Sequence, residues 1–335
     1  MSAQKLAVVT GGAGFIGSHM VDLLLQEGHR VHVIDNLLGG RLENLAHHKG
    51  DSRLVVEAKD IRDLGPDDPL FKQVEFVFHF AGIGDIVPSI DRPVDYVSTN
   101  VMGTIRVLEA ARHSRVRKLV YAASSSCYGI AEELPTTERA PIRPEYPYAL
   151  SKYMGEEAVL HWGRVYQLPV NSLRIFNAYG TRSKTSGAYG AVFGVFLAQK
   201  LAAKPFTVVG DGTQRRDFLY VTDVARAFYL AAKSERTNEI YNLGAGNPQP
   251  VNRLVELLGG EVVRVPKRPG EPDCTWADIS RIKARLGWEP RVSFEEGVAT
   301  LLRNIDYWRQ APVWDPASIE AATRTWFAFL SRKEK

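Results

Sequence analysis

Short apolar runs alternate with longer segments of helical spacing through the first half of the chain. Runs rich in β-branched residues predict strands at Leu6–Thr10, Val31–Asp35, Leu54–Val56, Phe76–Phe80, Lys118–Ala122 and Val170–Arg174. Between them, apolar residues recur every three or four positions, as in Ile16–Glu27 and Val101–His113, which predicts amphipathic helices. This alternation indicates an α/β fold, a doubly wound parallel sheet with helices on both faces.

The alternation becomes less regular after about Ala178, where loops rich in Gly and Arg occur at 210–217 and 244–250. We therefore expect residues 1–177 to form mainly the sheet domain and residues 178–335 mainly a smaller C-terminal α/β lobe, with some of the chain crossing back. The aromatic stretch Asn304–Phe329 is predicted to be core of that lobe.

Composition narrows the class of protein. The chain has 335 residues, of which 45% are hydrophobic and 24% charged, so it is long enough for a large folded core and is neither disordered nor fibrous. The net charge is +4 without a basic tract, which argues against a nucleic-acid partner. The two cysteines, Cys127 and Cys274, have no spacing typical of a metal site or a disulfide framework. The sequence also shows no signal-peptide pattern and no long apolar segment. We therefore expect a cytoplasmic protein without membrane or metal partners.

A glycine-rich turn follows the first predicted strand and opens the first predicted helix. It reads Gly-x-Gly-x-x-Gly at Gly12, Gly14 and Gly17. Glycines let the backbone approach a diphosphate closely, and the free N–H groups of a helix N-terminus favour its negative charge, as in a Rossmann-type nucleotide site. The residues of this segment that are expected to bind the cofactor are Gly11, Gly14, Phe15, Ile16 and Gly17.

Asp35 ends the second predicted strand, eighteen residues after Gly17. A carboxylate at this place accepts hydrogen bonds from the adenosine ribose and repels a 2′-phosphate, which favours NAD over NADP. Arg41, close by, could weaken that exclusion, but we interpret it as a solvated loop residue.

Tyr148 and Lys152 are four residues apart, so they share one face of a helix. They follow Ser124, at the end of a predicted strand on the edge of the sheet where a nucleotide binds. A nearby ammonium and the cofactor charge would favour the phenolate, so that Tyr148 can serve as a general base for a substrate alcohol held by Ser124.

These motifs together resemble the extended short-chain dehydrogenase/reductases, the sugar-nucleotide epimerase and dehydratase family. The segments that carry the resemblance are Thr10–Gly17, Asp35-Asn36, Asp60-Ile61, His79–Gly82, Asn100, Ser124–Gly129, Tyr148–Lys152, Arg174–Asn177, Arg216-Asp217 and Arg268–Glu271.

The resemblance implies a tightly bound, recycled NAD and a nucleotide sugar in the cleft between the two parts. It implies Tyr148 as base, Lys152 on the nicotinamide ribose and Ser124 on the reacting hydroxyl. The cofactor-binding residues that it implies are Asn36, Asp60, Ile61, Phe80, Ala81, Gly82 and Asn100 in addition to those above. The substrate-binding residues that it implies are Gly84, Ser124, Ser125, Ser126, Asn177, Ala191, Val192, Arg216, Arg268, Glu271 and Thr275.

Two serines decide between the reactions of this family. Relatives that dehydrate their sugar carry an Asp-Glu pair where this chain has Ser125 and Ser126. A hydroxyl cannot replace a carboxylate as an acid or base near neutral pH, so dehydration is disfavoured. The prediction is NAD-dependent 4-epimerisation of a UDP-sugar. A 4-keto-sugar reductase and a non-catalytic NAD- or nucleotide-sugar-binding regulator are the alternatives; Asp35 argues against the first and the intact Ser124, Tyr148 and Lys152 against the second.

The sugar itself is less defined. Thr275 stands where UDP-galactose 4-epimerases carry a bulky Tyr, and a smaller residue could admit an acetamido group. Gly84 stands where UDP-galactose epimerases carry a Lys, and the segment 187–192 resembles that of UDP-N-acetylhexosamine epimerases; both point away from a strict UDP-glucose enzyme. A UDP-uronate stays possible because Arg182, Lys184 or Arg92 could meet a carboxylate.

Two further expectations concern the rest of the chain. His79 is predicted to be a core or turn histidine and not a catalytic group. A homodimer through the helices at Val101–His113 and Tyr148–Tyr166 is implied by the family alone.

Overall fold

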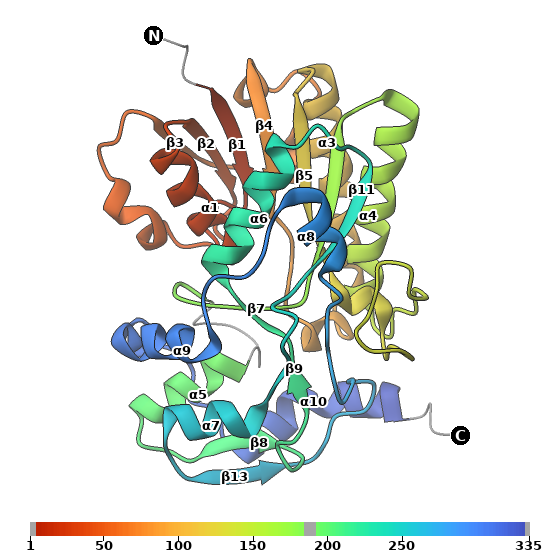
Figure 1. Ribbon diagram of the computed structural model, residues 1–335. Helices are drawn as coiled ribbons and strands as arrows, with labels where there is room; N and C mark the ends of the chain where they lie inside the picture. Colours follow the sequence, from red (N-terminus) through yellow and green to blue (C-terminus); the bar gives the residue numbers. More distant parts are fainter. Residues whose placement is uncertain (1–4, 184–191, 332–335) are drawn as a thin grey trace.

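The computed structural model describes residues 5–183 and 192–331 (Figure 1). Its central element is a parallel sheet of seven strands in the order β11-β6-β5-β4-β1-β2-β3. The bounds are β1 Leu6–Thr10, β2 Arg30–Asp35, β3 Leu54–Ala58, β4 Val74–His79, β5 Lys118–Ser124, β6 Val170–Ile175 and β11 Glu239–Leu243. This order confirms the predicted doubly wound fold.

Helices cover both faces of this sheet (Figure 1). One face carries α1 (Phe15–Gln26) and α6 (Val221–Lys233), which contact each other. The other face carries α3 (Thr104–His113) and α4 (Pro147–Tyr166). Successive residues of β1 alternate between the two cores, with Val9 packed on the first side and Val8 on the second, as the period of a strand requires.

Part of the second half of the chain returns to the sheet. β11 pairs with β6, with Tyr241 opposite Leu173, and α6 packs on α1. Both α6 and β11 come after position 178 in the sequence.

The remaining elements gather at one end of the sheet, in the lower half of Figure 1. Their helices are α5 Val192–Leu201, α7 Val251–Leu258, α9 Phe294–Arg303 and α10 Pro316–Leu330, while the short α8 Ser280–Leu286 contacts β11. Three strand pairs accompany them: β7 Asn177–Tyr179 with β10 Phe218–Tyr220, β9 Arg215–Arg216 with β12 Gln249–Pro250, and β8 Phe206–Val209 with β13 Val262–Val265. Trp308 and Trp326 are buried in their shared core, which agrees with the prediction for the aromatic C-terminal stretch.

One predicted helix differs in its first turns. Instead of an α-helix from Val101, the chain forms α2 (Pro93–Val97), then a π-helix, η5 (Ser98–Gly103), and only then α3. Asn100 lies in the π-helix. Such widened turns recur at functional sites, because they redirect a side chain without ending the helix.

Candidate active site

The glycine turn closes tightly between β1 and α1. Gly11 has φ +69°, donates its N–H to the Ile34 carbonyl at 2.8 Å, and leaves no room for a Cβ, which would lie 2.7 Å from the Ala81 nitrogen. Within the described chain, no side chain caps the N-terminus of α1. The first N–H groups of α1 can therefore bind an anion, so the residues present fit the diphosphate of NAD.

Asp35 lies beside this turn at the end of β2. Its carboxylate accepts hydrogen bonds from the backbone nitrogens of Ala13 (3.0 Å) and Leu37 (2.8 Å). Burial raises the pKa of Asp35, and these backbone hydrogen bonds oppose part of that rise. Since each carboxylate oxygen can accept a second hydrogen bond, the group remains able to bind ribose hydroxyls.

The residues expected on the adenine side lie together. The Asn36 amide donates to the Asp60 carboxylate at 2.8 Å, and Arg62 Nε donates to the same carboxylate at 2.9 Å. The hydrogen bonds from Arg62 hold the pKa of Asp60 well below its usual range. Ile61 is buried against Gly103, which has no room for a side chain.

Asn100 fixes the loop that follows β4. Its carboxamide oxygen accepts from the Ile83 nitrogen at 2.8 Å, and its amide donates to the Ile83 carbonyl at 3.1 Å and to Ser151 Oγ at 3.0 Å. A Cβ on Gly82 would lie 2.8 Å from the same carboxamide oxygen. Both amide hydrogens are used within the protein, so Asn100 shapes the predicted cofactor site through this loop and has no donor left for NAD.

His79 lies at the centre of a buried hydrogen-bond chain. Thr104 Oγ1 donates to the Asn100 carbonyl, so it accepts from His79 Nε2 at 2.9 Å. His79 Nδ1 then accepts from Thr10 Oγ1 at 2.6 Å, and Thr10 in turn accepts from the Ala81 nitrogen at 3.3 Å. Burial and the charge of Lys152 lower the pKa of His79 to about 3, so the ring is neutral and structural, as predicted.

Ser124, Tyr148 and Lys152 meet where β5 and α4 approach each other. Ser124 Oγ donates to Ser126 Oγ at 3.1 Å, and the Ser124 side chain acts to lower the pKa of the Tyr148 phenol against the effect of burial. Lys152 Nζ lies 4.4 Å from the centre of the Tyr121 ring and 4.0 Å from where a Cβ on Gly82 would be. The sequence-predicted catalytic residues thus border the loop of the predicted cofactor site.

The electrostatics of this group differ from the sequence-based expectation. Burial raises the pKa of Tyr148, and the Ser124 side chain only partly offsets it. Burial lowers the pKa of Lys152 to about 7, against the opposing charge of Glu156. The expectation that the ammonium favours the phenolate is therefore not met by the protein alone, because desolvation dominates both groups.

A buried ion pair behind this site was not predicted. Glu156, one helical turn after Lys152, pairs with Arg174 of β6, and Arg174 Nη1 donates to the Tyr128 hydroxyl at 2.8 Å. Ser172 Oγ donates to Glu156 at 2.7 Å. The spacing of Tyr148, Lys152 and Glu156 places Glu156 on the same helix face, which is the signal that could have identified it.

Three of the expected substrate-binding residues, Arg216, Arg268 and Glu271, lie together. Arg268 Nη2 donates to the Glu271 carboxylate at 3.2 Å, and Arg216 Nη2 lies 3.8 Å from the same carboxylate. Burial lowers the pKa of Arg216, while Glu271 opposes the effect. Two guanidinium groups share one carboxylate, so the cluster has a net positive charge that suits a diphosphate.

Thr275 and Asn177 also lie side by side. The Thr275 hydroxyl donates to the Asn177 carboxamide oxygen at 2.7 Å and accepts from the Asp217 nitrogen at 3.1 Å. The Asn177 amide nitrogen is then the group that can donate to a ligand. The position of Thr275 next to a candidate substrate residue agrees with a pocket wall, but its hydroxyl has structural partners that a Tyr could not replace.

The other candidate substrate residues are less closely associated with this group. Gly84 has open space where a side chain would be, Val192 begins α5, and Ala191 and Lys184 lie outside the described residues. Arg182 Nη1 pairs with Asp22 at 2.8 Å, and exposed Arg92 lies 3.8 Å from Asp95.

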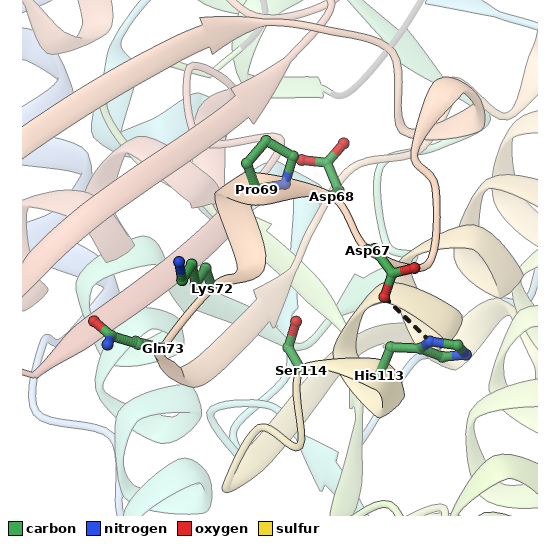
Figure 2. Close-up of a pocket in the computed structure, with 7 residues that line it drawn as sticks. All are labelled: Asp67, Asp68, Pro69, Lys72, Gln73, His113 and Ser114. Atoms are coloured by element: carbon green, nitrogen blue, oxygen red, sulfur yellow. Dashed lines mark ion pairs between the residues drawn. The ribbon is translucent and has the colours of Figure 1, made fainter.

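Two other clusters lie away from these residues. Figure 2 shows a pocket lined by residues 67–69, 72, 73, 113 and 114, beside the start of β4 and the end of α3, where His113 pairs with Asp67 at 3.5 Å. Parallel sheets bind ligands at the carboxyl ends of their strands, which is the opposite edge. His47 and His48 both hydrogen-bond to Asp22, whose carboxylate the Arg182 guanidinium also neutralises, so we interpret that cluster as a hydrogen-bonded group.

Known proteins resemble this chain over most of its length. The family model described as the NAD dependent epimerase/dehydratase family matches residues 7–244. UDP-glucose 4-epimerase of Mycolicibacterium smegmatis is 34% identical over 310 residues, covering 90% of this chain and 98% of that protein.

No helix in the described part of the chain is both long and apolar enough to cross a membrane.

Solved structures extend the likeness to other sugars. UDP-N-acetylglucosamine 4-epimerase of Methanobrevibacter ruminantium has a TM-score of 0.84 at 31% identity, covering 90% of this chain and 99% of that one. UDP-glucuronic acid 4-epimerase of Bacillus cereus, solved with UDP-glucuronic acid and NAD, has a TM-score of 0.83 at 30% identity, covering 91% and 99%. The chain belongs to the NAD-dependent epimerase/dehydratase family, which confirms the predicted family and its NAD cofactor.

Proposed function

We propose that the protein interconverts UDP-sugars that differ in configuration at C4, with a UDP-N-acetylhexosamine or a UDP-uronate as the preferred substrate and Ser124, Tyr148 and Lys152 as its catalytic residues. The observation that carries this proposal is that α4, with Tyr148 and Lys152, packs against β5, which ends at Ser124, and brings Lys152 Nζ to the Gly82 loop, in a site that has serines at 125 and 126. The relatives named above are 4-epimerases of three different UDP-sugars, which agrees with the reaction and leaves the sugar open.

Each of the three proposed catalytic residues has a separate role in the reaction. NAD, held by the turn at Gly11–Gly17 and by Asp35, would supply a reversible hydride acceptor for C4 of the sugar. Tyr148 removes the proton from the C4 hydroxyl and later returns one, while Ser124 hydrogen-bonds that oxygen. Lys152 binds the nicotinamide ribose. With NAD and the sugar bound, its positive charge lowers the pKa of the Tyr148 phenol.

The serines separate this reaction from dehydration. No carboxylate occupies positions 125 or 126, so the keto sugar meets no acid–base pair there that could eliminate water. The sugar can therefore turn over and be reduced again without losing a substituent.

Substitution of the proposed base tests these assignments. Tyr148→Phe keeps the ring and its packing but cannot exchange a proton, so kcat should fall by about 10²- to 10⁴-fold with the NAD content unchanged. The measurement is turnover of the UDP-sugar together with the absorbance of NAD released from denatured protein. A variant that retains more than a tenth of the activity would exclude Tyr148 as the base.

We also infer a cytoplasmic homodimer, with α4 and the η5–α3 segment at its interface. Leu150 (44% exposed) and Met154 (39%) stand one turn apart on α4, and Met102 (51%) is exposed on η5. Apolar side chains exposed together on neighbouring helices are typical of a surface that another chain covers.

A further inference from the structure

An aromatic residue beside the proposed base connects the site to the C-terminal helix. Tyr146 ends the loop before α4, and its ring lies parallel to that of Tyr148, with an interplanar angle of 9° and 6.4 Å between centroids. Its other neighbour is Trp326 of α10, at 5.0 Å between ring centroids. Tyr148, Tyr146 and the distant Trp326 thus form one row of aromatic rings, in which the indole is tilted by 51° to the Tyr146 ring.

The Tyr146 phenol also lies near the neighbour of the proposed catalytic serine. The Ser126 side chain acts to lower the pKa of the Tyr146 phenol against the effect of burial, and Ser126 Oγ accepts from Ser124 Oγ at 3.1 Å. Ser124 has the same effect on the pKa of Tyr148, so the pair of serines lies beside the two parallel tyrosine rings.

Burial and a hydrogen bond hold Trp326 beside Tyr146. It is only 1% exposed, and its indole Nε1 donates to the Pro269 carbonyl at 3.0 Å. Pro269 follows Arg268, one of the two arginines of the candidate diphosphate cluster. Ile319 and Leu330, on the same face of α10, are buried in the same core, so the helix holds the indole in place.

The helix contacts two further sides of the candidate sugar site. α10 touches η4 (Val87–Ser89), which follows the Gly84 loop, and Leu330 lies 3.6 Å from where a Cβ on Gly270 would be. One helix therefore contacts the loop after Gly84, the loop between Arg268 and Glu271, and the aromatic residue next to Tyr148.

We propose that Tyr146, held by Trp326, is a positioning residue that sets the width of the sugar pocket, so that α10 determines which UDP-sugars fit. This inference rests on the proposed function and specifies the substrate selection at the same site. Replacing the indole by a smaller group gives the Tyr146 ring space to move away from Tyr148, which widens the pocket.

The test compares Trp326→Ala and Trp326→Phe with the wild type. The measurement is kcat/KM for UDP-glucose and for UDP-N-acetylglucosamine, together with the NAD content. We expect Trp326→Ala to shift the ratio of the two values about tenfold towards the N-acetylated sugar, a change of the size that one added or missing group in a pocket produces. Trp326→Phe, which keeps an aromatic ring against Tyr146, should lie between. Phe329→Ala, which removes an exposed aromatic side chain from the same helix, is the matched control and should behave as the wild type.

A purely structural role for Trp326 gives a different result. Activity on both sugars would then fall in parallel with thermal stability, and an unchanged ratio in Trp326→Phe, or in Trp326→Ala where that variant folds, would overturn the proposal. Tyr146→Phe keeps the ring and removes only the hydroxyl, so it should leave the ratio within about twofold while kcat falls up to about tenfold, the value of one hydrogen bond.

Binding measurements separate this inference from the reaction itself. Titration calorimetry of the NAD-loaded proteins with the same two UDP-sugars reads the pocket without turnover. If the wild type converts neither sugar but Trp326→Ala shifts their relative affinity, the proposed epimerisation fails and the role of Trp326 stands. If turnover is normal and neither ratio moves, the role of Trp326 fails alone.

Discussion

At the scale of single residues, burial determines the chemistry of the site. Lys152 and Tyr148 both lose solvation on folding, and each is driven towards its neutral form. The sequence could predict which side chains meet, because an i, i+4 spacing on a helix fixes their common face. It could not predict their pKa values, because those depend on packing from β5, α4 and the loop after β4.

The buried Lys152 ammonium makes the stability of the NAD-free protein depend on pH. In the folded protein Lys152 loses its proton near pH 7, whereas in the unfolded chain it does so near 10.5. Between these values the unfolded chain binds more protons, so the free energy of unfolding rises with pH. Lys152→Met should raise the unfolding temperature near pH 7 by about 5 °C, with a difference that shrinks towards pH 10.

Thermal unfolding of NAD-free wild type and variant at pH 6.5 to 10 measures this effect. Lys49→Met, at an exposed lysine, is the control and should show no such trend. A difference between wild type and Lys152→Met that stays constant over the whole pH range would contradict the burial argument.

The side chain at position 275 is predicted to limit the size of the sugar that the pocket admits. Thr275→Tyr should abolish turnover of an N-acetylated UDP-sugar and spare a plain hexose, as a narrower pocket requires. Because Tyr also loses the hydrogen bonds to Asn177 and from Asp217, Thr275→Val is needed beside it, since it removes the hydroxyl at almost constant size. If Thr275→Tyr loses turnover of both substrates equally and Thr275→Val does the same, the loss of turnover is due to the missing hydrogen bonds and not to the size of the pocket.

At the scale of elements, the strand pattern of the sequence predicted the sheet well. The six expected strands all occur with ends shifted by at most two residues. The inner strands are buried on both faces and are therefore continuous apolar runs, whereas the edge strand β3 is largely exposed. The sequence did not reveal the π-helix at Ser98–Gly103, since its apolar pattern is that of an α-helix. Nor did it identify β11 as the seventh strand, because pairing between distant segments leaves no local signal.

The turn between β1 and α1 yields a prediction for the cofactor. A Cβ on Gly17 would overlap the Gly11 carbonyl oxygen, so Gly17→Ala must displace backbone of the turn. We expect NAD binding to weaken by at least about tenfold, which corresponds to about 1.4 kcal/mol. The check is the NAD content of purified protein and its affinity by calorimetry. Gly65→Ala, where a Cβ meets open space, should retain wild-type NAD binding; equal NAD content in both variants would contradict the assignment of this turn.

At the scale of the whole molecule, the sheet supplies the nucleotide-binding edge and the second half of the chain supplies the arginine cluster and the aromatic support. The family motifs of the sequence contained the residues of that edge and also Arg216 and Arg268 of the cluster. The role of α10 had no sequence signal, because Trp326 reaches Tyr146 only through the tertiary packing of two distant segments.

The inferred dimer is tested by charging its proposed surface. Leu150→Glu combined with Met154→Glu places two carboxylates in the middle of the apolar face of α4, so light scattering should give the mass of one chain. Val262→Glu, at an exposed position on β13, should leave the mass at two chains. A dimer that survives the double substitution would place the interface elsewhere.

The most direct test of the account is proton NMR of the purified protein mixed separately with UDP-N-acetylglucosamine, UDP-glucose and UDP-glucuronate, following the anomeric signals with no NAD added. The account predicts that one 4-epimer appears and grows to equilibrium, with the N-acetylated sugar or the uronate converted faster than UDP-glucose. Three spectra that stay unchanged, even after NAD is added, would contradict the assignment of the protein as a UDP-sugar 4-epimerase.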